Sequence, residues 1–144
     1  MTTTAGKRWI KTASILMLIL GIGGIIVAVA GIVGYSQMDA AMVKDMETLG
    51  ISVAGQRLQM TVTAAISLLE VVAALIGLVS MNDPERGRLC LVTGALLILC
   101  HLGNMVYGAV LTGFSAVTLV SFVLAVLFPF IYCVGGFKNM KAAR

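Results

Sequence analysis

The fold is decided by residues 58–110, where two long apolar runs are joined by a short polar turn. The runs are LQMTVTAAISLLEVVAALIGLVS (58–80) and LCLVTGALLILCHLGNMVYGAV (89–110), and the turn between them is MNDPERG (81–87). A helix needs about 20 mostly apolar residues to cross about 30 Å of hydrocarbon. Because the turn is so short, the two runs predict an antiparallel pair of membrane-spanning helices.

Two more apolar runs, Thr12–Tyr35 and Phe114–Gly136, flank this hairpin. The 144-residue chain is 60% hydrophobic and 11% charged, whereas a soluble domain is about 45–50% apolar and about 25% charged. We therefore predict a single all-α transmembrane domain over residues 1–144, folded as a four-helix bundle in up-down-up-down, antiparallel order. The expected helices cover about 10–35, 58–80, 84–110 and 114–136, with an outer loop at 36–57.

Basic residues are divided unequally between the two predicted sides of the membrane. The chain has 10 Lys+Arg against 6 Asp+Glu, a net charge of +4. Only Lys44 and Arg57 fall on one side; the other eight are Lys7, Arg8, Lys11, Arg86, Arg88, Lys138, Lys141 and Arg144. Because cytoplasmic loops are enriched in Lys and Arg, the division predicts a multi-pass cell-membrane protein with both termini cytoplasmic. Charges at helix ends indicate membrane lipids as partners, not nucleic acid.

The central hairpin carries polar residues where hydrocarbon is expected. An ionisable side chain at this depth costs at least about 2.5–3.5 kcal/mol, so it needs a partner. With a rise of about 1.5 Å per residue, Glu70 and His101 come within roughly 5 Å in height. The predicted buried polar cluster consists of Ser67, Glu70, Cys100, His101 and Asn104.

Two interpretations of this cluster stay open. In the structural one, a polar clasp of Glu70, His101 and Asn104 fixes the register of the two helices. In the functional one, Glu70 carries a proton or cation and His101 acts as a switch near neutral pH. The pair could be a buried ion pair or a neutral hydrogen bond, and desolvation favours the neutral form. We favour the clasp.

The first apolar run carries a stripe of small residues at steps of three and four, namely Gly21, Gly24, Ala28 and Gly31. Small residues let helix backbones approach closely in lipid, where van der Waals packing drives association. The stripe predicts helix packing. Packing within the same bundle is the preferred interpretation, and a homo-oligomer contact is the alternative.

The outer loop contains methionines at a spacing of four, at Met38, Met42 and Met46. With charged residues between them, they indicate a short amphipathic helix that lies on the membrane or caps the bundle. The alternative is a thioether site for a soft ion such as Cu(I).

No catalytic residues are predicted. The three cysteines form neither a disulfide framework nor a CxxC pair, and a single His, Glu and Cys do not give a recognised metal-ligand spacing. We therefore expect no enzyme activity and no cofactor. The leading expectation is a structural or protein-interaction role in the membrane, with self-association or other membrane proteins as partners. The alternative is a small transporter or channel for protons, cations or small molecules that uses Glu70, His101 and Asn104.

The layout resembles small four-helix membrane proteins of bacteria. The similar parts are the turn Asn82-Asp83-Pro84-Glu85-Arg86 and the ending from Pro129-Phe130-Ile131-Tyr132 through Gly135-Gly136 to Lys138. This resemblance implies the fold and no activity. Small multidrug exporters are similar in size but carry their glutamate in the first helix. Claudin-like proteins are similar in layout, but their Trp motif and paired cysteines are absent from residues 36–57.

Overall fold

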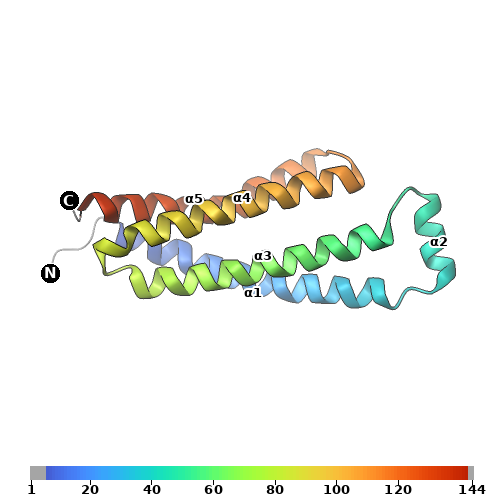
Figure 1. The fold of residues 1–144 in the computed structure, drawn as a ribbon, viewed down its shortest axis with the longest axis horizontal. Coiled ribbons are helices and arrows are strands. Elements are labelled where there is room, and N and C mark those ends of the chain that lie inside the picture. Colours follow the sequence, from blue (N-terminus) through green and yellow to red (C-terminus); the bar gives the residue numbers. More distant parts are fainter. Residues whose placement is uncertain (1–5, 143–144) are drawn as a thin grey trace.

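The computed structural model describes residues 6–142 and is helical throughout apart from short connections (Figure 1). The elements in chain order are α1 (Lys7–Ser36), α2 (Ala40–Thr48), α3 (Val53–Ser80), the 3₁₀ turn η1 (Pro84–Arg86), α4 (Gly87–Thr112) and α5 (Ala116–Ala142). This confirms the all-α prediction. Arg144, one of the eight predicted cytoplasmic basic residues, lies outside the described residues.

The four long helices lie side by side along the long axis and alternate in direction, while α2 lies across one end (Figure 1). The most extensive packing joins α1 to α3 and α4 to α5, and smaller interfaces between α1 and α5 and between α3 and α4 close the bundle. We call the end formed by residues 6–11, 81–88 and 137–142 the basic end. The opposite end, formed by residues 35–57 and 110–116, is the α2 end.

The helix boundaries differ from the expected ones: α1, α3 and α5 are longer, whereas α4 and α5 begin three and two residues later, at Gly87 and Ala116. The expected loop at 36–57 contains α2, whose N-terminus is capped by the Asp39 carboxylate accepting from the Met42 amide at 2.8 Å. It also contains the start of α3, where the Ser52 hydroxyl accepts from the Gly55 amide at 3.1 Å. Such caps satisfy amides that have no partner within the helix. The last helix, α5, continues to Ala142 rather than to 136.

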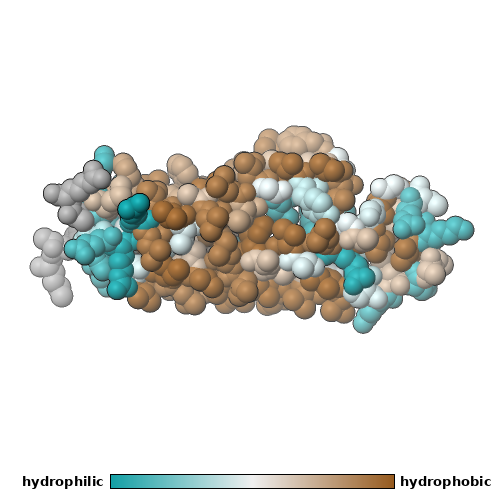
Figure 2. All heavy atoms as spheres, viewed as in Figure 1, coloured by the Kyte–Doolittle hydropathy of each residue, from teal (hydrophilic) through white to brown (hydrophobic). Residues whose placement is uncertain are grey.

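The four long helices are each long and apolar enough to cross a membrane. Their outward faces carry many exposed Leu, Ile, Val and Phe side chains, which form the brown belt along the molecule in Figure 2. A soluble monomer rarely exposes an apolar surface of this extent. Hydrophilic side chains gather at the two ends (Figure 2). The fold is therefore compatible with an integral membrane protein.

At the basic end, glycines let three helix backbones meet. A Cβ atom added to Gly136 of α5 would lie 2.7 Å from the carbonyl oxygen of Gly87 at the start of α4. A Cβ atom added to Gly135 would lie 2.9 Å from the amide nitrogen of Ile10 in α1. Both distances are shorter than side chains tolerate, so only glycine permits this packing of α5 against α1 and α4.

Two buried polar side chains of α5 reinforce this end. The Asn139 amide group donates to the carbonyl of Met81 at 3.4 Å, and its oxygen accepts from the Gly6 amide at 2.8 Å. About two turns further into the bundle, the buried Tyr132 hydroxyl donates to the carbonyl of Ala73 at 2.9 Å. These bonds tie α5 to the start of α1 and to α3.

The small-residue stripe of α1 packs against α3 of the same chain. An added Cβ at Gly21 would lie 2.9 Å from the carbonyl oxygen of Ser67, and one at Gly24 would collide with the Ser67 hydroxyl. An added Cβ at Gly31 would lie 2.9 Å from the sulfur of Met60. Ala28 is completely buried. The stripe is thus occupied within the bundle, as the preferred interpretation has it, and self-association stays a prediction.

We expect Gly136→Ala to lower stability, because the new methyl group would force α4 and α5 apart; such overpacking costs about 1–3 kcal/mol. The matched control is Gly103→Ala in α4, where an added Cβ meets no atom within 4 Å. The control should leave stability unchanged or raise it. Reversible unfolding in detergent micelles measures both variants. Equal stabilities of the two variants would contradict the glycine-contact account.

Candidate functional site

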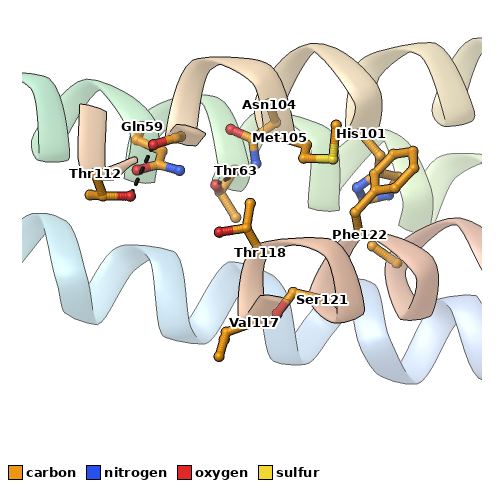
Figure 3. Close-up of a pocket in the computed structure, with 12 residues that line it drawn as sticks. Gln59, Thr63, His101, Asn104, Met105, Thr112, Val117, Thr118, Ser121 and Phe122 are labelled. Atoms are coloured by element: carbon orange, nitrogen blue, oxygen red, sulfur yellow. Dashed lines mark hydrogen bonds between the residues drawn. The ribbon is translucent and has the colours of Figure 1, made fainter. Parts of the chain in front are cut away.

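A cavity of about 390 Å³ lies between α3, α4 and α5 in the half of the bundle nearest the α2 end. Its polar side chains come from all three helices (Figure 3). They are Gln59 and Thr63 of α3, His101, Asn104 and Thr112 of α4, and Thr118 and Ser121 of α5. We call it the polar cavity. In Figure 2, paler and more hydrophilic side chains show through a gap in the brown surface at this level.

A second cavity of about 350 Å³ adjoins the first, and all four long helices line it. The two cavities share His101 and Ala125 as lining residues. The other walls are apolar, except for the carboxylate of Glu70 in α3. We call it the Glu70 cavity; its lining is Leu20, Glu70, His101, Leu124, Ala125 and Phe128.

Glu70 lies near the middle of the span. It comes ten residues before Ser80, the last residue of α3, which is about 15 Å at about 1.5 Å per residue. In a bilayer whose hydrocarbon core is about 30 Å thick, a carboxylate at this position would lie at the depth most costly for a charge. The polar cavity extends from the α2 end to His101, where it meets the Glu70 cavity and its carboxyl group.

The structure brings Glu70 and His101 to one cavity but does not bond them. Glu70 is 6% exposed, and its carboxylate forms no hydrogen bond or ion pair with any residue between 6 and 142. The Nε2 atom of His101 is also buried without a hydrogen-bond partner in that part of the chain. Both groups therefore keep hydrogen-bonding capacity for a species in the Glu70 cavity.

Asn104 makes the polar link between the two central helices. Its side-chain nitrogen donates to the hydroxyl of Thr63 at 3.2 Å, across the interface of α4 and α3. Figure 3 shows both side chains facing Thr118 of α5 across the polar cavity. The clasp expected of Glu70, His101 and Asn104 is thus made by Asn104 with Thr63.

The remaining members of the expected cluster lie elsewhere. Ser67 is buried at the contact with Gly24 of α1. Cys100 is a half-buried free thiol that lines neither cavity.

The outer-loop methionines do not share one helical face. Met38 comes before α2, whereas Met42 and Met46 lie on it. Met38 instead lines a separate pocket with Gly31, Gly34 and Tyr35 at the end of α1. In residues 6–142 no three His, Cys, Asp or Glu side chains are grouped so as to hold a metal ion.

Sequence reasoning did not select most of the polar lining. The unselected residues are Gln59, Thr63, Thr112, Thr118 and Ser121. Thr63 lies seven residues before Glu70, and Ser121 and Ala125 lie three and seven residues after Thr118, so helical spacing puts each set on one face. Isolated hydroxyl groups are common in membrane helices, because they can bond to their own backbone. The polar cavity could have been predicted only by knowing that the polar faces of α3, α4 and α5 meet. That knowledge requires the arrangement of the helices in space.

The chain has no match in the comparisons with known proteins. No family model matches it, and neither a curated protein nor a solved structure does. The site must therefore be interpreted from its own chemistry. That chemistry is one carboxyl group and one imidazole near the middle of the long helices, beside a cavity lined by amide and hydroxyl groups.

We expect Thr63→Val to remove the link to Asn104. Interhelical hydrogen bonds in membranes average about 0.6 kcal/mol and reach about 1.7 kcal/mol. A double-mutant cycle with Asn104→Ala, followed by unfolding in detergent, measures the coupling energy. The control is Thr61→Val, because the Thr61 hydroxyl donates within its own helix, to Arg57 at 2.9 Å. A coupling energy of zero between Thr63 and Asn104 would show that their hydrogen bond does not stabilise the contact between α3 and α4.

Proposed function

We propose that this protein is a small integral membrane transporter or channel for protons or small cations, in which Glu70 is the binding group. The observation that supports it is the position of Glu70, which is buried at mid-membrane depth and faces a cavity without a protein partner. Ionisable groups inside membrane bundles are costly and commonly mark ion or proton pathways.

The charge of Glu70 supports a cation as the transported species. No Lys or Arg side chain of residues 6–142 lines the Glu70 cavity. A carboxylate in such surroundings needs a counterion, either a proton or a bound cation. His101 adds to the same cavity a second group that can hold or release a proton.

The polar cavity supports a route to that site. Gln59, Thr112 and Thr118 line it toward the α2 end, and His101 lies where it meets the Glu70 cavity. Amide and hydroxyl oxygens can replace part of the hydration shell of a cation, or bind water that relays a proton. The route stops at Glu70, because the glycine contacts and Tyr132 fill the bundle beyond it.

The structural interpretation of the cluster is less well supported. A carboxyl group that fixed helix register would be engaged in hydrogen bonds between helices, whereas Glu70 makes none with residues 6–142. The Asn104–Thr63 bond already links α3 to α4. Glu70 is therefore available for a different task.

The charge distribution supports a cytoplasmic basic end. Seven basic residues lie there, namely Lys7, Arg8, Lys11, Arg86, Arg88, Lys138 and Lys141, and only Lys44 and Arg57 lie toward the α2 end. Under the positive-inside rule both termini are cytoplasmic, in a multi-pass protein of the cell membrane. The polar cavity then lies in the outer half of the membrane.

We expect Glu70→Gln to abolish cation flux, because the amide retains the shape of the side chain and cannot carry the charge. Proteoliposomes loaded with a pH-sensitive dye report proton flux, and Na⁺ or K⁺ gradients report the other cations. Glu47→Gln on the exposed helix α2 is the matched control and should retain full flux.

Flux unchanged in Glu70→Gln would overturn the proposal. So would wild-type protein that moves neither protons, Na⁺ nor K⁺ faster than protein-free liposomes. The structural role would then be the better account, and the unfolding stability of Glu70→Gln would measure it.

The connection between the two cavities gives a second test. Ala125 lines both of them, so Ala125→Leu should narrow the connection and lower flux while leaving Glu70 in place. Ala65→Leu adds the same side chain at an exposed position of α3 and is the control. Equal flux in the two variants would show that the route does not pass Ala125.

A further inference from the structure

The basic end carries a groove that is separate from the Glu70 cavity. It has a volume of about 380 Å³ and lies on the outer face of α5, beside α4. Leu91 of α4 and Cys133, Val134 and Phe137 of α5 give it apolar walls, and the side chains of Lys138 and Lys141 line its end. The groove is therefore apolar toward the membrane centre and positive toward the basic end.

Aromatic rings hold the two lysines beside the groove. The Lys138 ammonium lies 4.6 Å from the centre of the Trp9 ring, and the Lys141 ammonium lies 4.7 Å from the centre of the Phe137 ring. Both distances are within the range of cation–π attraction. Neither lysine forms an ion pair within residues 6–142. Their positive charges are held in place and are not neutralised by a neighbouring carboxylate.

The surrounding charge is also positive. Among the described residues the basic end has seven Lys and Arg side chains against two acidic ones, Asp83 and Glu85. Asp83 is already paired with Arg86 at 3.1 Å. A negatively charged group that approached Lys138 and Lys141 would therefore meet no local repulsion from a carboxylate of the groove.

The length of the groove fits the polar boundary of a bilayer. Cys133 and Lys141 are eight residues apart on α5, which is about 12 Å at about 1.5 Å per residue. The headgroup layer on each side of the hydrocarbon core is roughly 5–8 Å thick. The lysines then lie at headgroup level, while Val134 and Leu91 lie at the level of the first acyl carbons.

We propose that this groove binds an anionic phospholipid, with the phosphate on Lys138 and Lys141 and the upper acyl chain against Leu91, Val134 and Phe137. Charge complementarity selects an anionic headgroup, and the apolar inner half selects a lipid over a free anion. The proposal does not depend on Glu70 or on cation flux, since it concerns a different surface of α5.

Native mass spectrometry of the detergent-solubilised protein tests it, with phosphatidylglycerol and phosphatidylcholine added in equal amounts. The wild type should retain phosphatidylglycerol preferentially. Lys138→Gln/Lys141→Gln should lose that preference, and Lys141→Gln alone should lose part of it. The control is Lys7→Gln/Lys11→Gln, which removes the same charge from the same end but outside the groove, and it should retain the preference. Gel filtration checks that each variant is folded.

Three results would overturn the groove site. Equal retention of the two lipids by the wild type would exclude selection of an anionic headgroup. An equal loss in the control would show diffuse attraction to the whole basic end. Displacement of phosphatidylglycerol by millimolar inorganic phosphate would show an anion site without a role for the acyl chain. We expect inorganic phosphate to leave the bound lipid in place.

Discussion

Close contact between helix backbones at the basic end is the constraint on which the rest of the structure depends. In a membrane, helices associate through van der Waals packing and hydrogen bonds, since lipid is as apolar as the side chains. Gly135 and Gly136 of α5 provide that packing against Ile10 and Gly87, and Asn139 adds buried hydrogen bonds. Toward the α2 end, α3, α4 and α5 leave room for the polar cavity. The same four helices thus pack tightly at the basic end and enclose the polar cavity toward the α2 end.

Glu70 lies at the boundary between these two halves. On the side of the basic end, the Tyr132 ring and hydroxyl fill the space against α3. On the side of the α2 end, His101 lines both the Glu70 cavity and the polar cavity. A charge enclosed by packed side chains would be very costly, and a charge facing a polar route is less so. The energetic cost of placing Glu70 in the bundle is therefore reduced because the tightly packed part ends at Tyr132 and a cavity begins beside the carboxylate.

The sequence predicted what depends on length and helical rise. The hairpin at 58–110 followed from two long apolar runs and a short turn, and the similar depth of Glu70 and His101 followed from a fixed rise per residue. It could not predict how α5 is rotated and placed, so Thr118 and Ser121 were not selected. Nor could it show that the Asn104 side chain donates a hydrogen bond to the Thr63 hydroxyl. It also could not show that the Glu70 carboxylate has no hydrogen-bond partner within residues 6–142. Those outcomes depend on side-chain direction and on distances of an ångström or less.

The rotation of α5 also keeps its two proposed surfaces apart. Ala125 lines both inner cavities and Val134 lines the lipid groove. Nine residues separate them, which at about 100° per residue places them on opposite sides of the helix. One face of α5 therefore lines the inner cavities, while the opposite face lines the groove proposed to bind lipid. The proposed cation route and the proposed lipid groove thus depend on the same helix placement, although they share no lining residue.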